Sequence, residues 1–435
     1  MFNKVLLTFT TRILTALLSV VNVLIGTNYL GVEGYGTISL IILGVTVYLM
    51  IQNLITGSSI VYFISRFNVG SIIILSYAWV LISALAFSLI TYGSLELSRY
   101  FGWDFEIVPA DYALHNIFIA MGYGLMNIHL NVLLGRERIK AFNFIFFIQH
   151  ALASAMLVLF YIVLQKKDLE YYLIALYASY FTSFIISFTL TMSYIKDLRK
   201  PMISEFKSML KYGALGQSAN VFQLINYRLS YYLIDIFVGR ASLGVFSAAT
   251  QISEGLWILG KSIATVQFAR ISNSDDRNYA HRLSMKLLKF TSTLTLLPLI
   301  ILTVMPKEFY TFLLGEEFIQ VRSLIRWMAV GTLSLTASMI LSHYFSGTGR
   351  IAKNTMASGM GVIITVILGF TLIPTFGIKG AAVITSSSYF VALLYLFILF
   401  QREHDGTLRD YLIRWKDVRE SYALVFKRKQ MENQA

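Results

Sequence analysis

Seven ionisable residues lie within stretches that are otherwise apolar enough to cross a membrane. A charged side chain inside a span costs about 2.5 to 3.5 kcal/mol on insertion scales, so it usually faces a cavity or a partner. Five of the seven are basic and two are acidic, which predicts a cavity that favours an anionic group. The basic residues are Arg12, Arg228, Lys261, Arg322 and Arg326, and the acidic residues are Asp235 and Glu254.

Some of these charges could instead serve structure. Counted from the turn between Gly239 and Ser242, Arg228 and Glu254 both lie about 17 Å deep at about 1.5 Å per residue, so they could pair and fix two helices. Arg12 and Lys261 could likewise snorkel to the inner headgroups. For each residue, a purely structural role and contact with the substrate are about equally supported by the sequence.

Other chemistry finds little support in the chain. There is no cysteine, and the six histidines form no HExxH motif or other metal-ligand spacing. The glycines of GVEGYG (31–36) follow no strand and join two apolar runs, so a tight turn is favoured over a phosphate loop. Asp104 and Glu106 fit an anionic outer loop. We therefore predict no catalytic residues, no metal and no cofactor.

The elements that carry these residues are membrane-spanning helices. Hydrophobic residues make up 56% of the 435 residues, charged residues only 14%, and the mean hydropathy is +0.66, so lipid must be the main solvent. We predict an all-α polytopic membrane protein with about 12 transmembrane helices. The predicted spans are 5–29, 36–64, 70–93, 111–134, 141–164, 171–195, 212–238, 242–267, 285–306, 321–345, 354–375 and 378–401.

The charge distribution orients these spans. With the N-terminus in the cytoplasm, 25 Lys and Arg residues lie inside and six lie outside, as the positive-inside rule requires. An even number of spans also places the basic tail inside. The net charge of +13 therefore indicates membrane orientation and does not indicate nucleic-acid binding. The first apolar run is too long for a signal peptide, so it is taken as a span.

The chain repeats itself. LGVEGYGTIS (30–39) aligns with VGRASLGVFS (238–247), and LGRERIKAFN (134–143) aligns with SGTGRIAKNT (346–355), at offsets that differ by four residues. Each match falls at the same topological position of its half, which predicts two six-span lobes inserted the same way up. The aligned pairs are Gly31 with Gly239, Gly36 with Gly244, Gly135 with Gly347, and Arg138 with Arg350.

We therefore divide the chain into four parts. Residues 1–195 form an N-terminal lobe and residues 212–401 a C-terminal lobe. Between them, 196–211 form a cytoplasmic linker that could be an interfacial helix or a plain tether. Residues 402–435 form a basic cytoplasmic tail in which apolar residues recur at helical spacing, typical of an amphipathic helix on the membrane surface.

Four stretches resemble the multidrug/oligosaccharidyl-lipid/polysaccharide exporter (MOP) superfamily, especially bacterial Wzx-type O-antigen and polysaccharide flippases. They are NYLGVEGYGTISL (28–40), LLGRERIKAFN (133–143), LINYRLSYYLIDIFVGRASLGVFSAATQISEGLW (224–257) and LIPTFGIKGAAVITSSSYF (372–390). The resemblance implies two six-helix lobes in a V, as in MATE transporters, that open alternately to either face.

The resemblance also implies a cargo. This is an oligosaccharide repeat unit of O-antigen or another surface polysaccharide, linked through pyrophosphate to a polyprenol and moved from the cytoplasmic to the periplasmic leaflet of the bacterial inner membrane. Arg12 and Arg228 are the leading residues for its pyrophosphate. Expected partners are the lipid-linked oligosaccharide, membrane lipids, and the polymerase and glycosyltransferases of the pathway.

Two other functions stay open. An ion-coupled multidrug or cation exporter of the same fold would need a more acidic cavity, and a membrane polysaccharide polymerase or ligase would need catalytic residues. Coupling to H+ or Na+ could run through Asp235 or Glu254, although no sodium-site motif is present.

Overall fold

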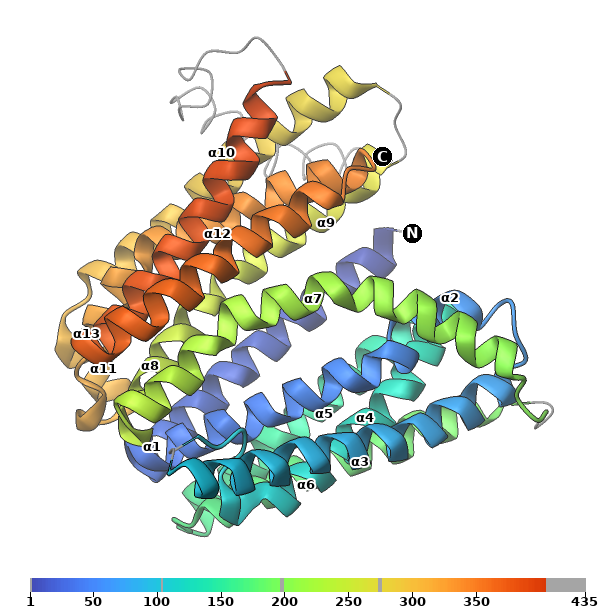
Figure 1. Ribbon diagram of the computed structural model, residues 1–435, viewed down its shortest axis with the longest axis horizontal. Coiled ribbons are helices and arrows are strands. Elements are labelled where there is room, and N and C mark those ends of the chain that lie inside the picture. The colour runs from blue at the N-terminus through green and yellow to red at the C-terminus, as the bar shows by residue number, and fades with distance from the viewer. Residues whose placement is uncertain (1, 103–104, 196–198, 273–275, 404–435) are drawn as a thin grey trace, which may run out of the picture. The chain divides into compact units, whose positions relative to one another are not determined.

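The computed structural model describes residues 2–102, 105–195, 199–272 and 276–403 (Figure 1). Every regular element within these ranges is a helix, and eight helices are long and apolar enough to cross a membrane. The predicted all-α polytopic class is therefore confirmed. Residues 404–435, where an amphipathic tail helix is predicted, lie outside the described residues.

Packing divides the chain into two units. The first contains the residues up to Ala248 together with Tyr310–Ile319, and the second contains Ala249–Phe309 and the residues from Gln320 onward. The main helices of the first unit are α1 (Phe2–Thr56), α2 (Ser58–Phe63), α3 (Val69–Phe101), α4 (Ala113–Gly135), α5 (Ile139–Leu157), α6 (Leu169–Met192), α7 (Ile203–Phe237) and the first half of α8 (Arg240–Gly255). Short elements of this unit are η1 (Ala110–Tyr112), η2 (Val158–Val163), the end of α11 (Lys307–Leu314) and η3 (Glu316–Phe318).

The second unit contains the other long helices. They are α9 (Trp257–Ser272), α10 (Arg277–Val304), α12 (Val321–Gly347) and α13 (Ala352–Gln401).

Two of the longest helices are each two helices joined at a glycine. α1 turns at Gly31 (φ 65°, ψ −173°) and α13 turns at Gly377 (φ 59°, ψ −140°), backbone conformations that glycine adopts without a Cβ penalty. If each bent helix is counted as two spans, the eight candidate spans become ten. The other two predicted spans fall on α7 and on the α8–α9 pair, so the count of twelve stays a prediction.

Some boundaries differ from those expected. α7 runs without interruption from Ile203, so the linker predicted over 196–211 and the seventh predicted span share one helix. The eighth predicted span is divided between α8 and α9, which have 16 residues each, shorter than one bilayer crossing. The predicted lobe boundaries at 195 and 212 stay predictions.

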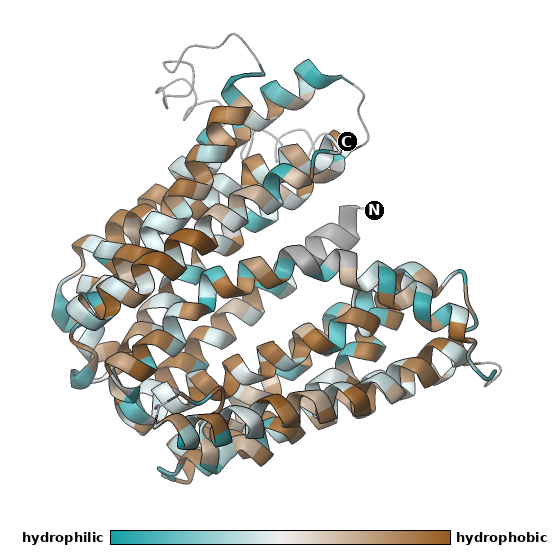
Figure 2. Cartoon of the chain, in the orientation of Figure 1, coloured by the Kyte–Doolittle hydropathy of each residue, from teal (hydrophilic) through white to brown (hydrophobic). Residues whose placement is uncertain are grey.

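Hydrophobic residues recur along the long helices (Figure 2), and many of them are exposed, as lipid contact requires. On α3, Leu81, Leu85 and Leu89 recur every four residues and are 63 to 67% exposed, whereas Phe87 on the opposite face is fully buried. Phe87 packs edge-on against Tyr48 of α1 within the main apolar cluster of the first unit. This row of exposed leucines would be unfavourable in water but is suited to hydrocarbon.

The second repeated segment has the same backbone conformation in each unit. α4 ends at Gly135 and α12 ends at Gly347, and two residues later Glu137 and Gly349 both have positive φ, 56° and 78°. In each turn the next amide then bonds to the carbonyl five residues back. These bonds are Arg138 N to Leu133 O (2.8 Å) and Arg350 N to Phe345 O (2.7 Å). The sequence repeat therefore corresponds to a repeated helix-ending turn.

Candidate functional site

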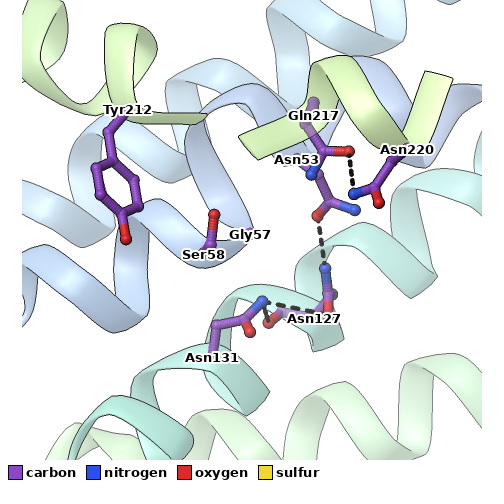
Figure 3. Close-up of a pocket in the computed structure, with 8 residues that line it drawn as sticks. All are labelled: Asn53, Gly57, Ser58, Asn127, Asn131, Tyr212, Gln217 and Asn220. Atoms are coloured by element: carbon purple, nitrogen blue, oxygen red, sulfur yellow. Dashed lines mark hydrogen bonds between the residues drawn. The ribbon is translucent and has the colours of Figure 1, made fainter. Parts of the chain in front are cut away.

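A pocket within the first unit is lined mainly by amide side chains (Figure 3). Its volume of about 670 Å³ lies within the range of roughly 300–1,000 Å³ typical of small-molecule sites. The lining residues are Asn53, Gly57, Ser58, Asn127, Asn131, Tyr212, Gln217 and Asn220.

Three helices and one turn bring these residues together. Asn53 lies in the last turn of α1, and Gly57 and Ser58 form the junction between α1 and α2. Asn127 and Asn131 are four residues apart on α4, so they share one face of that helix. The remaining lining residues come from the first half of α7.

Hydrogen bonds orient the amides. Asn127 Nδ2 donates to Asn53 Oδ1 at 3.1 Å, and Asn131 Nδ2 donates to Asn127 Oδ1 at 3.3 Å. Across the pocket, Asn220 Nδ2 donates to Gln217 Oε1 at 3.0 Å (Figure 3). Asn131 Nδ2 also donates to the carbonyls of Thr56 at 3.0 Å and Asn127 at 2.9 Å, so its donors are used within the protein. An amide has two donor hydrogens and an oxygen that can accept two bonds, so the contacts of Asn53, Gln217 and Asn220 leave hydrogen-bonding capacity for a ligand.

Buried polar contacts hold α1 against α4 beside the pocket. Gln52, the neighbour of Asn53, is fully buried and donates from Nε2 to the carbonyl of Gly124 at 2.9 Å. A Cβ on Gly124 would lie 2.9 Å from the Gln52 amide, so the absence of a side chain permits this approach. The position of Asn53 thus depends on a contact one residue away.

α7 is held on α1 and α2 in the same way. A Cβ on Gly213 would overlap the carbonyl oxygen of Leu54, so only glycine allows α7 to come this close to α1. Ser59 Oγ donates to the carbonyl of Met209 at 2.9 Å in a fully buried contact. Tyr212 directly precedes Gly213 in α7, so the close approach of α7 to α1 brings Tyr212 to the pocket.

An aromatic and cationic stack lies beside the pocket. The rings of Tyr212 and Tyr62 stack with centroids 4.4 Å apart and planes 17° from parallel. The guanidinium carbon of Arg66 lies 3.8 Å from the centroid of Tyr62. Two groups so close to one ring centre must occupy its opposite faces, so Arg66, Tyr62 and Tyr212 form three successive layers, with the exposed cation at one end.

The pocket itself carries no formal charge. Among the described residues that line it there is no Asp, Glu, His, Lys or Arg. A fully charged ligand group placed inside would lose its hydration without an opposite charge to compensate for it. The lining is suited to an uncharged group that is rich in hydrogen-bond donors and acceptors.

The structure places three of the seven predicted charged residues in the first unit. Arg12 is exposed on α1, and its guanidinium carbon lies 4.1 Å from the ring centroid of Phe146. Arg228 Nη1 donates to the hydroxyl of Tyr231 at 2.7 Å.

Asp235, the third of these residues, pairs with Arg240. Its carboxylate accepts from Nε at 2.6 Å and from Nη2 at 3.0 Å. The role predicted for Asp235, ion coupling or charge pairing, stays a prediction.

The other four predicted residues belong to the second unit. Arg326 Nε donates to the carbonyl of Thr303 at 2.8 Å. Because the seven residues are divided between two units, a single cationic cavity stays a prediction, as do their roles. The four are Glu254 on α8, Lys261 on α9, and Arg322 and Arg326 in the first turns of α12.

None of these seven described residues lines the amide pocket, so the charged residues of the sequence do not indicate where it lies. A signal was present, because Asn53, Asn127 and Asn131 lie in predicted spans, where amides commonly bond across helices. Within the described part of the chain no group of three or more His, Asp or Glu residues could hold a metal ion.

The helices have the arrangement seen in solved polytopic membrane proteins. It matches the lipid II flippase MurJ in an inward closed conformation with a TM-score of 0.72 and 16% identity, over 98% of this chain and 93% of that chain. It also matches the inward-facing conformation of a multidrug resistance MATE family transporter of the MOP superfamily, with a TM-score of 0.67 and 15% identity, over 89% of this chain and 94% of that chain. The chain thus shares the fold of these two structures, which is the fold that the sequence resemblance predicted.

Two relatives match part of the chain at the sequence level. The chain is 20% identical over 198 residues to the probable low-salt glycan biosynthesis flippase Agl15 of Haloferax volcanii. It is 21% identical over 181 residues to the capsular polysaccharide biosynthesis protein CapF of Staphylococcus aureus. These matches cover 45% and 41% of this chain, and 42% and 46% of the relatives, so the chain spans less than half the length of each. No protein-family model matches the chain.

Proposed function

We propose that the protein is a flippase for lipid-linked glycans. Its cargo is an oligosaccharide repeat unit of O-antigen or another surface polysaccharide, linked by pyrophosphate to a polyprenol. By alternating access it moves this cargo from the cytoplasmic to the periplasmic leaflet of the bacterial inner membrane, with both termini cytoplasmic. The observation that carries the proposal is an uncharged, amide-lined pocket in a MOP fold.

The pocket favours this cargo over that of the rival exporter. A drug or cation exporter needs a carboxylate to compensate for a positive charge taken out of water. The described lining offers amides and hydroxyls, which match the hydroxyl groups of a glycan. Relatives described as flippase and capsular polysaccharide biosynthesis protein agree with a glycan cargo, and they do not favour a polymerase or ligase.

The pyrophosphate of the cargo requires a cation, and Arg12 is the first choice. It is exposed on α1, and stacking on Phe146 orients its guanidinium plane while leaving its edge N–H groups able to bind phosphate oxygens. Arg228 is the second choice. Coupling to H+ or Na+ and cooperation with the polymerase and glycosyltransferases of the pathway belong to the same proposal.

Deletion of the gene tests the function. We expect surface polysaccharide to be lost and lipid-linked glycan to accumulate in the membrane, measured by gel analysis and by mass spectrometry of extracted lipids. Normal surface polysaccharide together with increased drug sensitivity would contradict the proposal and favour the exporter.

Complementation with variants tests the cation. Removing one charge-assisted contact costs about 1.5–3 kcal/mol, so Arg12→Ala should lower export about tenfold or more, and Arg12→Lys should retain part of it. Arg99→Ala is the matched control, because the pair that Arg99 forms with Glu96 is exposed and should contribute little. Equal export by the Arg12→Ala and Arg99→Ala variants would exclude Arg12 as the phosphate residue.

A further inference from the structure

We propose that the amide pocket is a glycan subsite that holds sugar rings next to the pyrophosphate, and that Arg66, in addition to Arg12, binds the pyrophosphate at the predicted entry side of the pocket. This inference rests on the proposed function and assigns the recognition of sugar and of phosphate to different residues of the first unit. Four features of the site support it.

The first feature is the match between donors and acceptors. A sugar hydroxyl both donates and accepts, and so does every amide side chain, whereas a carboxylate accepts only and an ammonium donates only. Amides from α1, α4 and α7 converge on one space of about 670 Å³. The hydrogen bond between Asn127 and Asn53 and the one between Asn220 and Gln217 hold these groups in place before a ligand arrives.

The second feature is the neutrality of the lining. Phosphate oxygens need a positive partner, which the described lining residues do not supply. The pocket is therefore suited to the uncharged part of the cargo and unsuited to its pyrophosphate. If the sugar part of the cargo occupies the pocket, its pyrophosphate therefore needs a cation next to the pocket.

The third feature is the aromatic stack, which supplies that neighbour. Tyr212 lines the pocket, is 38% exposed and is supported from behind by Tyr62. Its ring offers an apolar surface on which the C–H face of a sugar can pack. Arg66 is exposed beyond Tyr62, two ring spacings away, in the geometry of a cation held by an aromatic ring.

The fourth feature is the location of the pocket in the first unit. Asn53 lies three residues before the end of α1, and Asn131 lies four residues before the end of α4. The turns that follow carry Arg66 and the basic segment 136–140, which the charge distribution predicts to be cytoplasmic. A cargo assembled on the cytoplasmic leaflet would therefore meet the pocket and Arg66 at the predicted entry side.

The test compares two lipid probes on the purified protein in nanodiscs. One is the lipid-linked glycan fraction extracted from the deletion strain, and the other is polyprenyl pyrophosphate without sugar. The intact protein should bind the glycan lipid at least tenfold more tightly than the bare lipid. If it binds neither, or if the deletion strain accumulates no glycan lipid, the proposed function itself is wrong.

Variants then separate the two halves of the site. Asn53→Leu combined with Asn127→Leu removes both partners of the hydrogen bond between these half-buried amides, and Asn131 keeps its bonds to the carbonyls of Thr56 and of residue 127. This double variant should lose about tenfold in affinity for the glycan lipid and keep its affinity for the bare lipid within about twofold. Arg66→Ala should weaken the binding of both lipids by the same factor.

The matched control is Gln223→Leu, an exposed amide on α7 that bonds to Tyr227 and does not line the pocket. If the first double variant does not fold, Gln217→Leu with Asn220→Leu makes the same test from α7. Equal binding of the two lipids by the intact protein, or unchanged preference in a folded double variant, would overturn the subsite while leaving the flippase function intact.

Discussion

Gly36 of α1 and Gly244 of α8 pack directly against each other. A Cβ on Gly36 would lie 3.1 Å from the nitrogen of Gly244, and a Cβ on Gly244 would lie 3.0 Å from the nitrogen of Gly36. The contact is reciprocal, since the first Cβ would overlap the carbonyl oxygen of Arg240 and the second that of Val32. Gly36 and Gly244 are 208 residues apart, and so are Val32 and Arg240. The two copies of the repeat therefore meet through equivalent atoms.

This contact predicts that neither glycine tolerates a side chain. Gly36→Ala and Gly244→Ala should each destabilise the protein by about 1–3 kcal/mol, because the two backbones must separate. The melting temperature in detergent measures the effect. Gly93→Ala on α3 is the control: with no atom within 4 Å of a Cβ there, it should be neutral or slightly stabilising. A melting temperature like that of the control for both variants would show that the contact contributes nothing.

The bend of α1 is a second test site. Gly31 has φ 65°, a Cβ on it would lie 2.8 Å from Glu317 Oε2, and the same oxygen accepts from Val32 N at 3.0 Å. Gly31→Ala should therefore cost more than Gly102→Ala, which has open space and an αL backbone (φ 66°, ψ 31°) that other residues can adopt. The excess has two sources, the Glu317 contact and the backbone strain of φ 65° with ψ −173°, and such strain costs of order 1–3 kcal/mol.

A rescue variant identifies the source of that excess. Glu317→Ala removes the crowding carboxylate, so combined with Gly31→Ala it should recover the part of the melting temperature that the contact costs and leave the part that the backbone strain costs. If the combined variant is no more stable than Gly31→Ala, the excess has another cause.

The ion pair of Asp235 and Arg240 predicts coupled substitutions. The side chain of Asp235 is 7% exposed and that of Arg240 is 23% exposed, and Arg240 also lies 3.5 Å from Glu106. Removing either partner leaves a poorly hydrated charge, so a double-mutant cycle with Asp235→Ala and Arg240→Ala should give a coupling energy of about 0.5–3 kcal/mol. Additive losses, together with transport that loses its dependence on H+ or Na+ in Asp235→Asn, would favour ion coupling over pairing.

The end of α13 should respond to pH. Burial alone would raise the pKa of Glu403, but hydrogen bonds from Tyr344 at 2.7 Å, from Arg350 and from Lys353 at 3.1 Å lower it below its ordinary 4.5. A lowered pKa contributes stability that is present above the unfolded value and is lost as pH falls through the folded value.

Melting temperatures across pH measure this contribution. The Glu403→Gln variant should melt below the wild type at neutral pH, and the difference should close as pH falls below 4.5. Glu96→Gln is the control, because its pair with Arg99 is about 70% exposed and should matter little at any pH. A difference that stays constant with pH would exclude a role for the charge of Glu403.

Much of the fold could be predicted because its signals are local. Apolar runs of span length gave most helices, and the aligned glycines marked turns whose backbone is in fact alike, as at Gly135 and Gly347. Boundaries were less predictable, because hydropathy reports contact with lipid and does not report where a helix ends. For this reason α3 continues to Phe101, beyond the predicted end of its span at 93.

By itself, the sequence determined the membrane class, the repeat and the list of costly charges, since each depends on residue type or on spacing within one segment. Only the tertiary structure decided which side chains share a site. Asn53 and Asn127 are separated by 74 residues, and Gln217 comes from a third helix. An uncharged amide in a span has a small free-energy cost, so a single amide in the sequence does not indicate a site. The pocket exists because Gly124 and Gly213 allow three helices to approach closely, and such an approach is a property of pairs of surfaces.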